Sequence, residues 1–137
     1  MGTNLYISIM LFILIMTYII IDTSSILFAL SNNKDVFEAV KLKDPSYEPL
    51  ISLGILNELN GIGGSEKGKG KFANAALYMI KEHQPDIANS NATVDDWIVE
   101  EAEKRKCDVC TNDMELKKRL KEKGITVFTV SRSGELR

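Results

Sequence analysis

Residues 18–21, Tyr-Ile-Ile-Ile, form a short run of β-branched and aromatic side chains that ends at Asp22. A strand with one face in water alternates apolar and polar residues, whereas this run is apolar at every position, as in a strand buried on both faces. Such strands belong to parallel sheets that helices cover on both sides. The run therefore predicts a parallel sheet, with Asp22 at the carboxyl end of one strand.

The rest of the chain alternates short apolar runs with amphipathic segments. Further strands are expected near residues 50–51, 107–110 and 125–130. This order predicts an α/β fold, a three-layer α/β/α sandwich whose central, mostly parallel sheet has about five strands. Helices are expected between the strands, and loops at 63–70 and 86–91. The segments expected to be helical are 26–30, 35–42, 52–60 and 72–80, one that follows Thr93 and ends before the strand at 107, and one that follows Asp113 and stops at Gly124.

Residues 5–21 are almost continuously apolar, and about 17 residues is the lower limit for a membrane-spanning helix. No basic region precedes the run and no small-residue cleavage site follows it, which argues against a secretory signal. We expect residues 1–16 to be an apolar extension, either packed on the core or upstream of a natural start at Met16. Residues 17–137 are then the folded domain, and a membrane anchor in 5–21 is the alternative.

The chain has 17 Lys and Arg against 19 Asp and Glu, and its net charge of −2 does not suggest a strongly basic nucleic-acid binder. Its two cysteines, Cys107 and Cys110, have the C-x-x-C spacing, but only His83 could help them to complete a zinc site. Buried thiols in a reducing compartment are therefore expected, which favours a cytoplasmic protein.

Gly63, Gly68 and Lys69 match the start of a phosphate-binding loop. The match fails at Gly70, where a metal-binding Ser or Thr is required, and a helix precedes the loop in place of a strand. We exclude nucleoside triphosphate binding here. The lysines of this loop could instead contact a nucleic-acid backbone or simply be solvated.

Acids occupy several positions that point toward structure. Asp22 and Asp113 follow strands, and ligands of parallel sheets lie beyond the carboxyl ends of the strands. Glu58 falls on the apolar stripe of its helix and Asp95 begins that of another, so both are expected to face the core. Burying a carboxylate costs free energy unless a partner compensates. If these acids meet, a divalent cation would relieve their repulsion, and hard oxygen ligands favour Mg²⁺ or Mn²⁺.

Most of these acids also have a simpler explanation. Asp95 could oppose the dipole of its helix, Asp113 could cap the next helix, and Asp22 could cap a turn. Glu58 lies in mid-helix, where capping offers no explanation.

Short motifs around these acids resemble, in order and spacing, the acidic motifs of the PIN-domain nucleases. The likeness covers Thr17 to about Val130. It implies an α/β sandwich, RNA cleavage that depends on magnesium or manganese, and assembly into dimers or larger oligomers. The family includes VapC toxins, which pair with an antitoxin, and archaeal or eukaryotic proteins of ribosomal RNA processing, to which this chain looks nearer. The motifs are Ile-Ile-Asp22-Thr-Ser, Ile-Leu-Asn-Glu58-Leu, Val-Asp95-Asp-Trp-Ile and Val-Cys-Thr111-Asn-Asp113.

We therefore expect an endoribonuclease acting on RNA, in which Asp22, Glu58, Asp95 and Asp113 hold one or two Mg²⁺ or Mn²⁺ ions. A catalytically idle RNA-binding PIN scaffold and a toxin ribonuclease are the alternatives. Residues expected to orient the carboxylates or assist them are Thr23, Ser24, Thr111 and Asp96. Residues that could contact an RNA backbone, or merely face solvent, are Lys104, Lys106, Lys117, Lys118 and Arg119.

Overall fold

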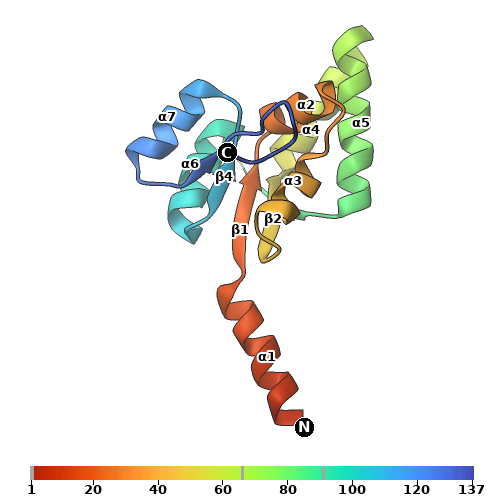
Figure 1. Ribbon diagram of the computed structural model, residues 1–137. Helices are drawn as coiled ribbons and strands as arrows, with labels where there is room; N and C mark the ends of the chain where they lie inside the picture. Colours follow the sequence, from red (N-terminus) through yellow and green to blue (C-terminus); the bar gives the residue numbers. More distant parts are fainter. Residues whose placement is uncertain (1, 66, 91) are drawn as a thin grey trace.

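A computed structural model describes residues 2–65, 67–90 and 92–137 of the chain. Its centre is a five-stranded sheet with strand order β3-β2-β1-β4-β5, in which every neighbouring pair is parallel (Figure 1). The central strand is the triple-isoleucine run, so the parallel sheet expected from that run is confirmed. The strands are β1 (Thr17–Ile21), β2 (Tyr47–Ser52), β3 (Asp86–Ala88), β4 (Asp108–Cys110) and β5 (Val127–Phe128).

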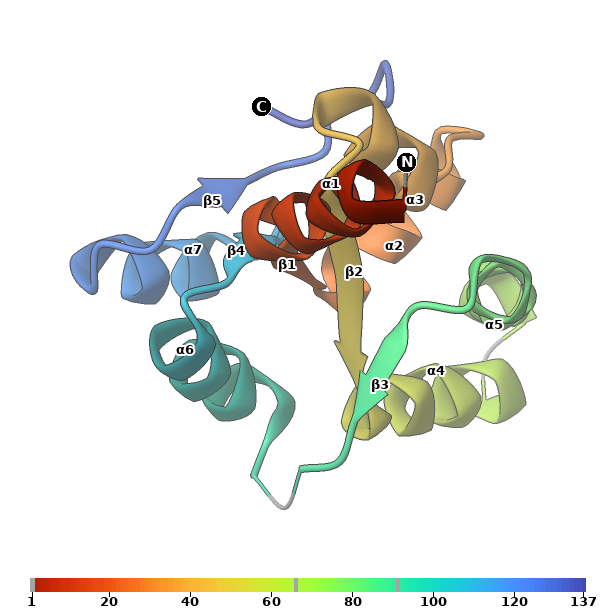
Figure 2. The same cartoon turned by 90° about the horizontal axis from the view of Figure 1, so that it is seen from below.

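Helices cover both faces of the sheet, which confirms the three-layer arrangement. Ile19 and Ile21 pack into one core with the helices that follow β1 and β2, whereas Ile20 packs into a second core with the last two helices. Successive strand residues point to opposite faces, so the isoleucine run serves both cores. Figure 2 shows α6 and α7 on one side of the strands and α2 to α5 on the other. The helices are α1 (Gly2–Ile15), α2 (Thr23–Ser31), α3 (Val36–Lys43), α4 (Leu53–Ser65), α5 (Lys67–His83), α6 (Val94–Arg105) and α7 (Met114–Glu122).

The prediction of a loop at 63–70 is wrong. Helix α4 continues through Gly61 to Ser65, and α5 begins at Lys67, with Glu66 outside the described residues. Helices α4 and α5 pack against each other along their lengths. Packing of this kind outweighs the low helix propensity of glycine, which costs about 1 kcal/mol per residue relative to alanine.

The loop expected at 86–91 contains a short edge strand, β3. It pairs with β2 through the register Leu50 to Asp86 and Ser52 to Ala88. Asp86 and Ile87 are exposed, so this strand is specified by its backbone pairing and not by an apolar run.

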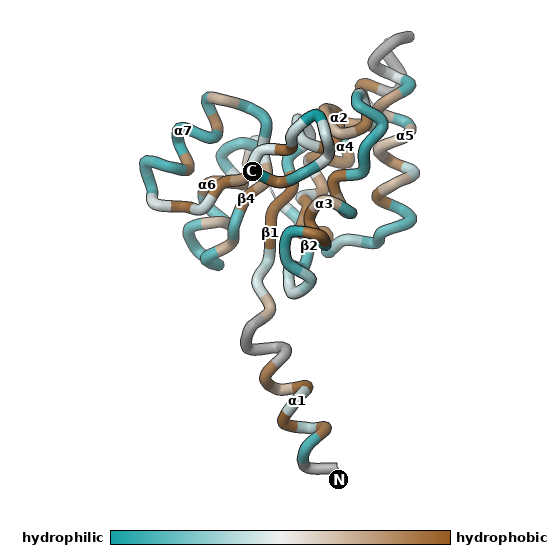
Figure 3. Tube along the Cα trace, in the orientation of Figure 1, coloured by the Kyte–Doolittle hydropathy of each residue, from teal (hydrophilic) through white to brown (hydrophobic). Residues whose placement is uncertain are grey.

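The apolar run 5–21 is divided between two elements. Its first part forms α1, which extends away from the sheet with exposed side chains at residues 4–11 (Figures 1 and 3). Its last part is the central strand β1, so residues 5–21 do not form one continuous helix. Among the helices that the structure describes, none combines the length and the apolar character that crossing a bilayer requires.

Both cysteines are buried free thiols, as expected. Cys107 packs into the core beneath α6 and α7, and Cys110 packs into the core on the other face of the sheet. Burial raises the pKa of Cys107 to about 11 and that of Cys110 to about 12. The two side chains lie on opposite faces, so they cannot act as a redox pair or share a metal.

Candidate active site at the carboxyl edge of the sheet

Segments from both helical layers meet where β1, β2 and β4 end. Asp22 follows β1 directly and Asp113 lies shortly after β4. Glu58 is on α4, which follows β2, and Asp95 is in the first turn of α6. The topology therefore brings the expected acids to one edge of the sheet, where parallel α/β folds bind ligands.

Asp22 is the most enclosed of these acids, with 5% of its surface exposed. Its Oδ2 atom accepts hydrogen bonds from Ser24 Oγ at 2.6 Å and from Thr111 Oγ1 at 2.8 Å. Its backbone N–H donates to the carbonyl of Cys110 at 3.0 Å, which ties the end of β1 to β4. Its Oδ1 atom makes no hydrogen bond to a described residue and is not sealed in the core, so this oxygen is available to a ligand.

Glu58 faces this edge from α4. Thr23 Oγ1 donates to Glu58 Oε2 at 3.0 Å. Desolvation raises the pKa of Glu58, and the negative charges of Asp22 and Asp95 raise it further, while the Thr23 hydrogen bond lowers it. The expectation that Glu58 faces the core is wrong, because Ile55 and Leu59 fill that face and leave the Glu58 side chain open to solvent.

Asp95 completes the electrostatic link between the two layers. Desolvation raises its pKa, and so do the charges of Asp22 and Asp113, while the Arg119 cation lowers it. Its side chain is exposed, so its expected burial in the α6 core is wrong as well. The core-facing part of α6 begins with Trp97 and Ile98. Asp95 lies above that core at the rim of the site.

Asp113 has two roles in the geometry. It is the N-cap of α7, where its Oδ1 atom accepts from the backbone N–H groups of Glu115 at 2.9 Å and Leu116 at 3.2 Å. Its own N–H donates to Thr111 Oγ1 at 3.1 Å. The capping explanation for Asp113 therefore holds. Its charge nevertheless contributes to the raised pKa of Asp95. The Oδ2 atom of Asp113 accepts no hydrogen bond from a described residue.

Asp96, expected to assist the site, turns toward α7. Arg119 Nη2 donates to Asp96 Oδ1 at 2.9 Å, and this bond lowers the pKa of Asp96. Of the lysines considered above, Lys117 donates from Nζ to Thr129 Oγ1 at 2.9 Å. Lys104 and Lys106 are at the opposite end of α6 from Asp95, about 15 Å along the helix, so the structure does not bring them to the acids.

Asn112 was missed by the sequence analysis, although it lies inside the Thr-Asn-Asp motif. Its Oδ1 atom accepts from Ser25 Oγ at 2.7 Å and from the Val130 N–H at 3.1 Å, and its Nδ2 donates to the Val130 carbonyl at 3.0 Å. Its backbone N–H donates to Ser24 Oγ at 3.0 Å. Asn112 thus joins α2, the loop after β4 and the C-terminal segment beneath the acids.

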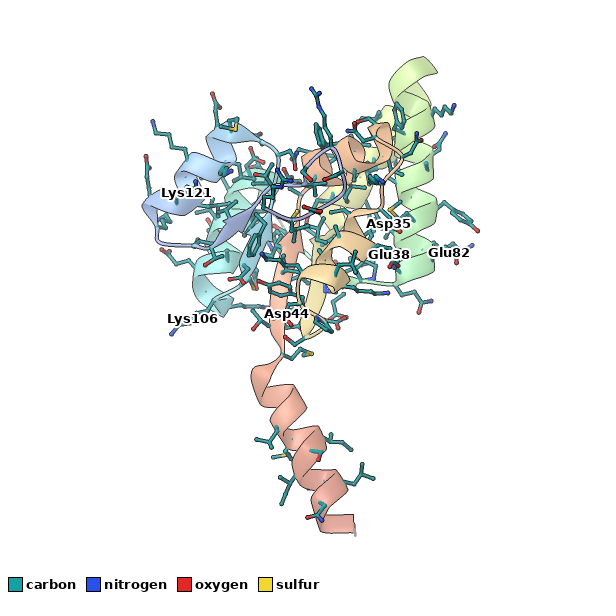
Figure 4. The ribbon with its side chains drawn as sticks, in the orientation of Figure 1. Asp35, Glu38, Asp44, Glu82, Lys106 and Lys121 are labelled. Carbon is teal, nitrogen blue, oxygen red and sulfur yellow. The ribbon has the colours of Figure 1, made fainter. Side chains whose placement is uncertain are left out.

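A separate group of possible metal ligands lies between α3 and α5. Ligand atoms of Asp35, Glu38 and His83 lie within 4.8 Å of one another. Figure 4 places Asp35 and Glu38 beside α5, far from α7 and Lys121. His83 Nε2 lies 2.7 Å from Asp35 Oδ2, and the His83 ring stacks on Phe37. Asp35 Oδ1 caps α3, so these contacts already account for the group as a link between two helices.

The donor set at the sheet edge consists of carboxylate oxygens with hydroxyl groups behind them. Asp22, Glu58, Asp95 and Asp113 come from four separate segments, and their charges raise the pKa values of Glu58 and Asp95. Hard oxygen donors with excess negative charge suit Mg²⁺ or Mn²⁺ and not softer metals. The chemistry of these donors therefore suits a divalent cation, although among the described residues no three of the four carboxylates bring ligand atoms within 4.8 Å of one another.

Comparison with known proteins identifies the family. The family model described as "PIN like domain" matches residues 19–132. Ribonuclease VapC9 of Archaeoglobus fulgidus is 30% identical over 109 residues, covering 79% of this chain and 78% of that protein.

Two solved structures share the fold. The PIN domain endonuclease Utp24 superposes with a TM-score of 0.73 at 28% identity, covering 88% of this chain and 90% of the other. A domain of a functionally unknown protein from Methanocaldococcus jannaschii gives a TM-score of 0.60 at 17% identity, covering 84% of this chain and 91% of the other, which is a likeness of fold alone. The family match, the parallel sheet and the related structures agree, and this chain belongs to the PIN-like domain family.

Proposed function

We propose that the protein is a divalent-metal-dependent endoribonuclease that hydrolyses RNA phosphodiester bonds at the carboxyl edge of its sheet. One observation carries the proposal: Thr111 Oγ1 contacts both Asp22 Oδ2 and the Asp113 N–H, and Thr23, next to Asp22, donates to Glu58 Oε2. The charges of Asp22 and Asp113 also add to desolvation in raising the pKa of Asp95. Carboxylates from four separate segments therefore share one electrostatic environment. Similarity to a ribonuclease and to an endonuclease supports the assignment of the reaction.

The carboxylates would hold Mg²⁺ or Mn²⁺ through the oxygens that accept no hydrogen bond from a residue that the structure describes. When bound, such an ion lowers the pKa of a coordinated water and stabilises negative charge on a phosphate. Ser24 and Thr111 hold Asp22 Oδ2, which leaves Oδ1 for the ion. These hydroxyl groups orient the carboxylate, the usual role of groups that surround metal ligands.

Glu58 and Asp113 are held by other groups. Thr23 fixes Oε2 of Glu58, and the α7 backbone fixes Oδ1 of Asp113. Glu58 and Asp113 thus each have one oxygen oriented by the protein and one that accepts no hydrogen bond from a described residue. Such preorganisation limits the rearrangement needed when charge develops on the substrate.

We propose ribosomal RNA processing as the biological role, because the Thr-Asn-Asp motif followed by a basic helix resembles the archaeal processing proteins more than the toxins. A toxin ribonuclease is the second candidate, favoured by the 30% identity to Ribonuclease VapC9. Expression in a bacterial host separates them. A toxin would arrest growth in a manner that Asp95→Asn abolishes and a co-expressed antitoxin relieves, whereas a processing nuclease would leave growth unaffected.

The central experiment is cleavage of single-stranded and structured RNA with Mn²⁺, with Mg²⁺ and with EDTA. We expect cleavage with either metal, none in EDTA, and a loss of at least 100-fold in Asp95→Asn. Glu100→Gln is the matched control, because Glu100 is exposed on the same helix and is expected to keep full activity. Equal cleavage by Asp95→Asn and the native protein would end the assignment, and metal-independent RNA binding without cleavage would favour the idle scaffold.

A further inference from the structure

The Arg119–Asp96 pair links the two helices whose first turns carry acids of the site. Asp96 follows Asp95 in α6, and Arg119 lies in α7, which Asp113 caps. Arg119 Nη2 donates to Asp96 Oδ1 at 2.9 Å, with 46% of the Arg119 side chain and 54% of the Asp96 side chain exposed. The guanidinium group therefore lies at the rim of the acidic site and not in the core.

Most of the hydrogen-bonding capacity of Arg119 is unused. A guanidinium has five N–H donors, and Arg119 makes this one side-chain hydrogen bond among the residues that the structure describes. Its planar fork matches the oxygens of a phosphate, and it is always charged. The remaining donors are thus available to an anion that approaches from solvent.

The site itself would repel a polyanion. Arg119 is hydrogen-bonded to Asp96, the residue that follows Asp95 in the first turn of α6. Its positive charge therefore lies beside the acidic site, where it can attract a phosphate.

The lysines of α7 do not duplicate this position. Lys117, Lys118 and Lys121 line a shallow depression on one face of the helix. At about 100° per residue, Arg119 points at least 100° away from each of them. Figure 4 shows Lys121 on the outer side of α7.

We propose that Arg119 binds a backbone phosphate of the RNA next to the acidic site, and that Asp96 is a positioning residue which holds the guanidinium there. This inference rests on the proposed function, because it names the contact through which that site receives its substrate. It also gives Asp96 a role other than metal binding.

A purely structural role makes different predictions. An exposed ion pair contributes little to folding stability, so breaking it would hardly change the melting temperature. Removing the negative charge of Asp96 would by itself strengthen binding of an anion. Weaker RNA binding by Asp96→Asn is therefore the result that only positioning predicts.

The test measures binding of a fluorescent 20-nucleotide RNA by anisotropy in EDTA, together with kcat and KM for cleavage with Mn²⁺. We expect Arg119→Gln to weaken binding about 5- to 30-fold and to act mainly on KM, with Arg119→Lys intermediate. Asp96→Asn should weaken binding, and the double variant should bind no worse than Arg119→Gln, since both changes remove one interaction. Melting temperatures should stay within about 2 °C of the native protein.

Arg105→Gln is the matched control. Arg105 pairs with Glu101 in the last turn of α6, at the other end of the helix from Asp96. The proposal is overturned if Arg119→Gln binds RNA as the native protein does, if Arg105→Gln loses as much affinity, or if Asp96→Asn binds more tightly. Should the native protein bind RNA through Arg119 in EDTA but never cleave it, this inference stands and the nuclease proposal fails.

Discussion

Thr23 Oγ1 donates a 3.0 Å hydrogen bond to Glu58 Oε2, which joins the first turn of α2 to the middle of α4. Thr23 is 7% exposed and Glu58 is open to solvent, so the bond is partly buried. Desolvation and the charges of Asp22 and Asp95 raise the pKa of Glu58, and this hydrogen bond lowers it. Thr23 therefore partly offsets the desolvation and the neighbouring charges that raise the pKa of Glu58.

Thr23→Val should shift the acid limb of the activity profile to higher pH. Valine has the shape of threonine but lacks the hydroxyl donor, so the pKa of Glu58 should rise further. At mildly acid pH, Glu58 is then protonated in a larger fraction of the molecules. We expect a modest loss of activity at pH 8 and a much larger loss at pH 6, measured as kcat/KM with Mn²⁺. Thr23→Ser, which keeps the donor, should behave as the native protein, and identical profiles for valine and threonine would refute this role.

Asp95→Asn should stabilise the metal-free protein while abolishing activity. The native pKa of Asp95 is raised, so its carboxyl binds protons more tightly in the folded state than in the unfolded chain. The free energy of unfolding then falls as pH rises from the unfolded pKa, about 4, through the native value. At pH 7 in EDTA we expect the variant to melt about 1–3 °C above the native protein.

Asp96→Asn is the control for that experiment, because the pKa of Asp96 is lowered whereas that of Asp95 is raised. The Arg119 hydrogen bond lowers the pKa of Asp96, so its ionised form contributes stability above the unfolded pKa, which is lost as the pH falls. Its melting temperature should be unchanged or lower. Mn²⁺ should raise the melting temperature of the native protein but not that of Asp95→Asn.

The architecture could be predicted because its signals are local. The isoleucines of β1 identify a strand buried on both faces, and the order of apolar runs gives the parallel sheet. The acids could be located because they follow strands or occupy unusual helix positions. The solvent exposure of these acids could not be predicted. Helical periodicity shows on which face of a helix a residue lies, but not whether the core extends beneath the end of that helix. Asp95 is an example, because it lies on the apolar face of α6 and is exposed.

The contacts that organise the site depend on distances between remote segments. The sequence motif groups Thr23 with Asp22, yet its hydroxyl binds Glu58, 35 residues away. Asp96 is adjacent to Asp95, yet its partner is Arg119 on another helix. Such pairs follow from the packing of helices against one sheet, and no local pattern in a single sequence specifies them.

Asn112→Ala should destabilise the fold more than its partial exposure suggests. The side chain satisfies both the N–H and the carbonyl of Val130, which is 1% exposed, and these groups would be left without partners. We expect a loss of about 2–3 kcal/mol in the free energy of unfolding, measured with urea. Asn74→Ala, at an exposed position of α5, should change it by less than about 0.5 kcal/mol. Similar values for the two variants would show that Asn112 is not a structural anchor.

Both cysteines should resist modification in the native protein. Their pKa values of about 11 and about 12 leave almost no thiolate at pH 8, and both side chains are buried. We expect neither thiol to react with a disulfide reagent within an hour unless urea is added, and activity to be insensitive to the reagent. Rapid reaction of either thiol without loss of structure would contradict the placement of Cys107 and Cys110 in separate cores.

Removal of residues 1–15 should leave the domain intact. The side chains at residues 4–11 of α1 are exposed, and β1 begins only at Thr17, so few contacts of the sheet are lost. We expect a chain of residues 16–137 to unfold with a free energy within about 0.5 kcal/mol of the full chain and to cleave RNA equally. It should also self-associate less, because α1 exposes several large apolar side chains, among them Leu5, Ile9 and Leu11. The full-length variant in which Leu5, Ile9 and Leu11 are changed to Ser is the control. If that variant folds and the truncated chain does not, the backbone of α1 belongs to the domain.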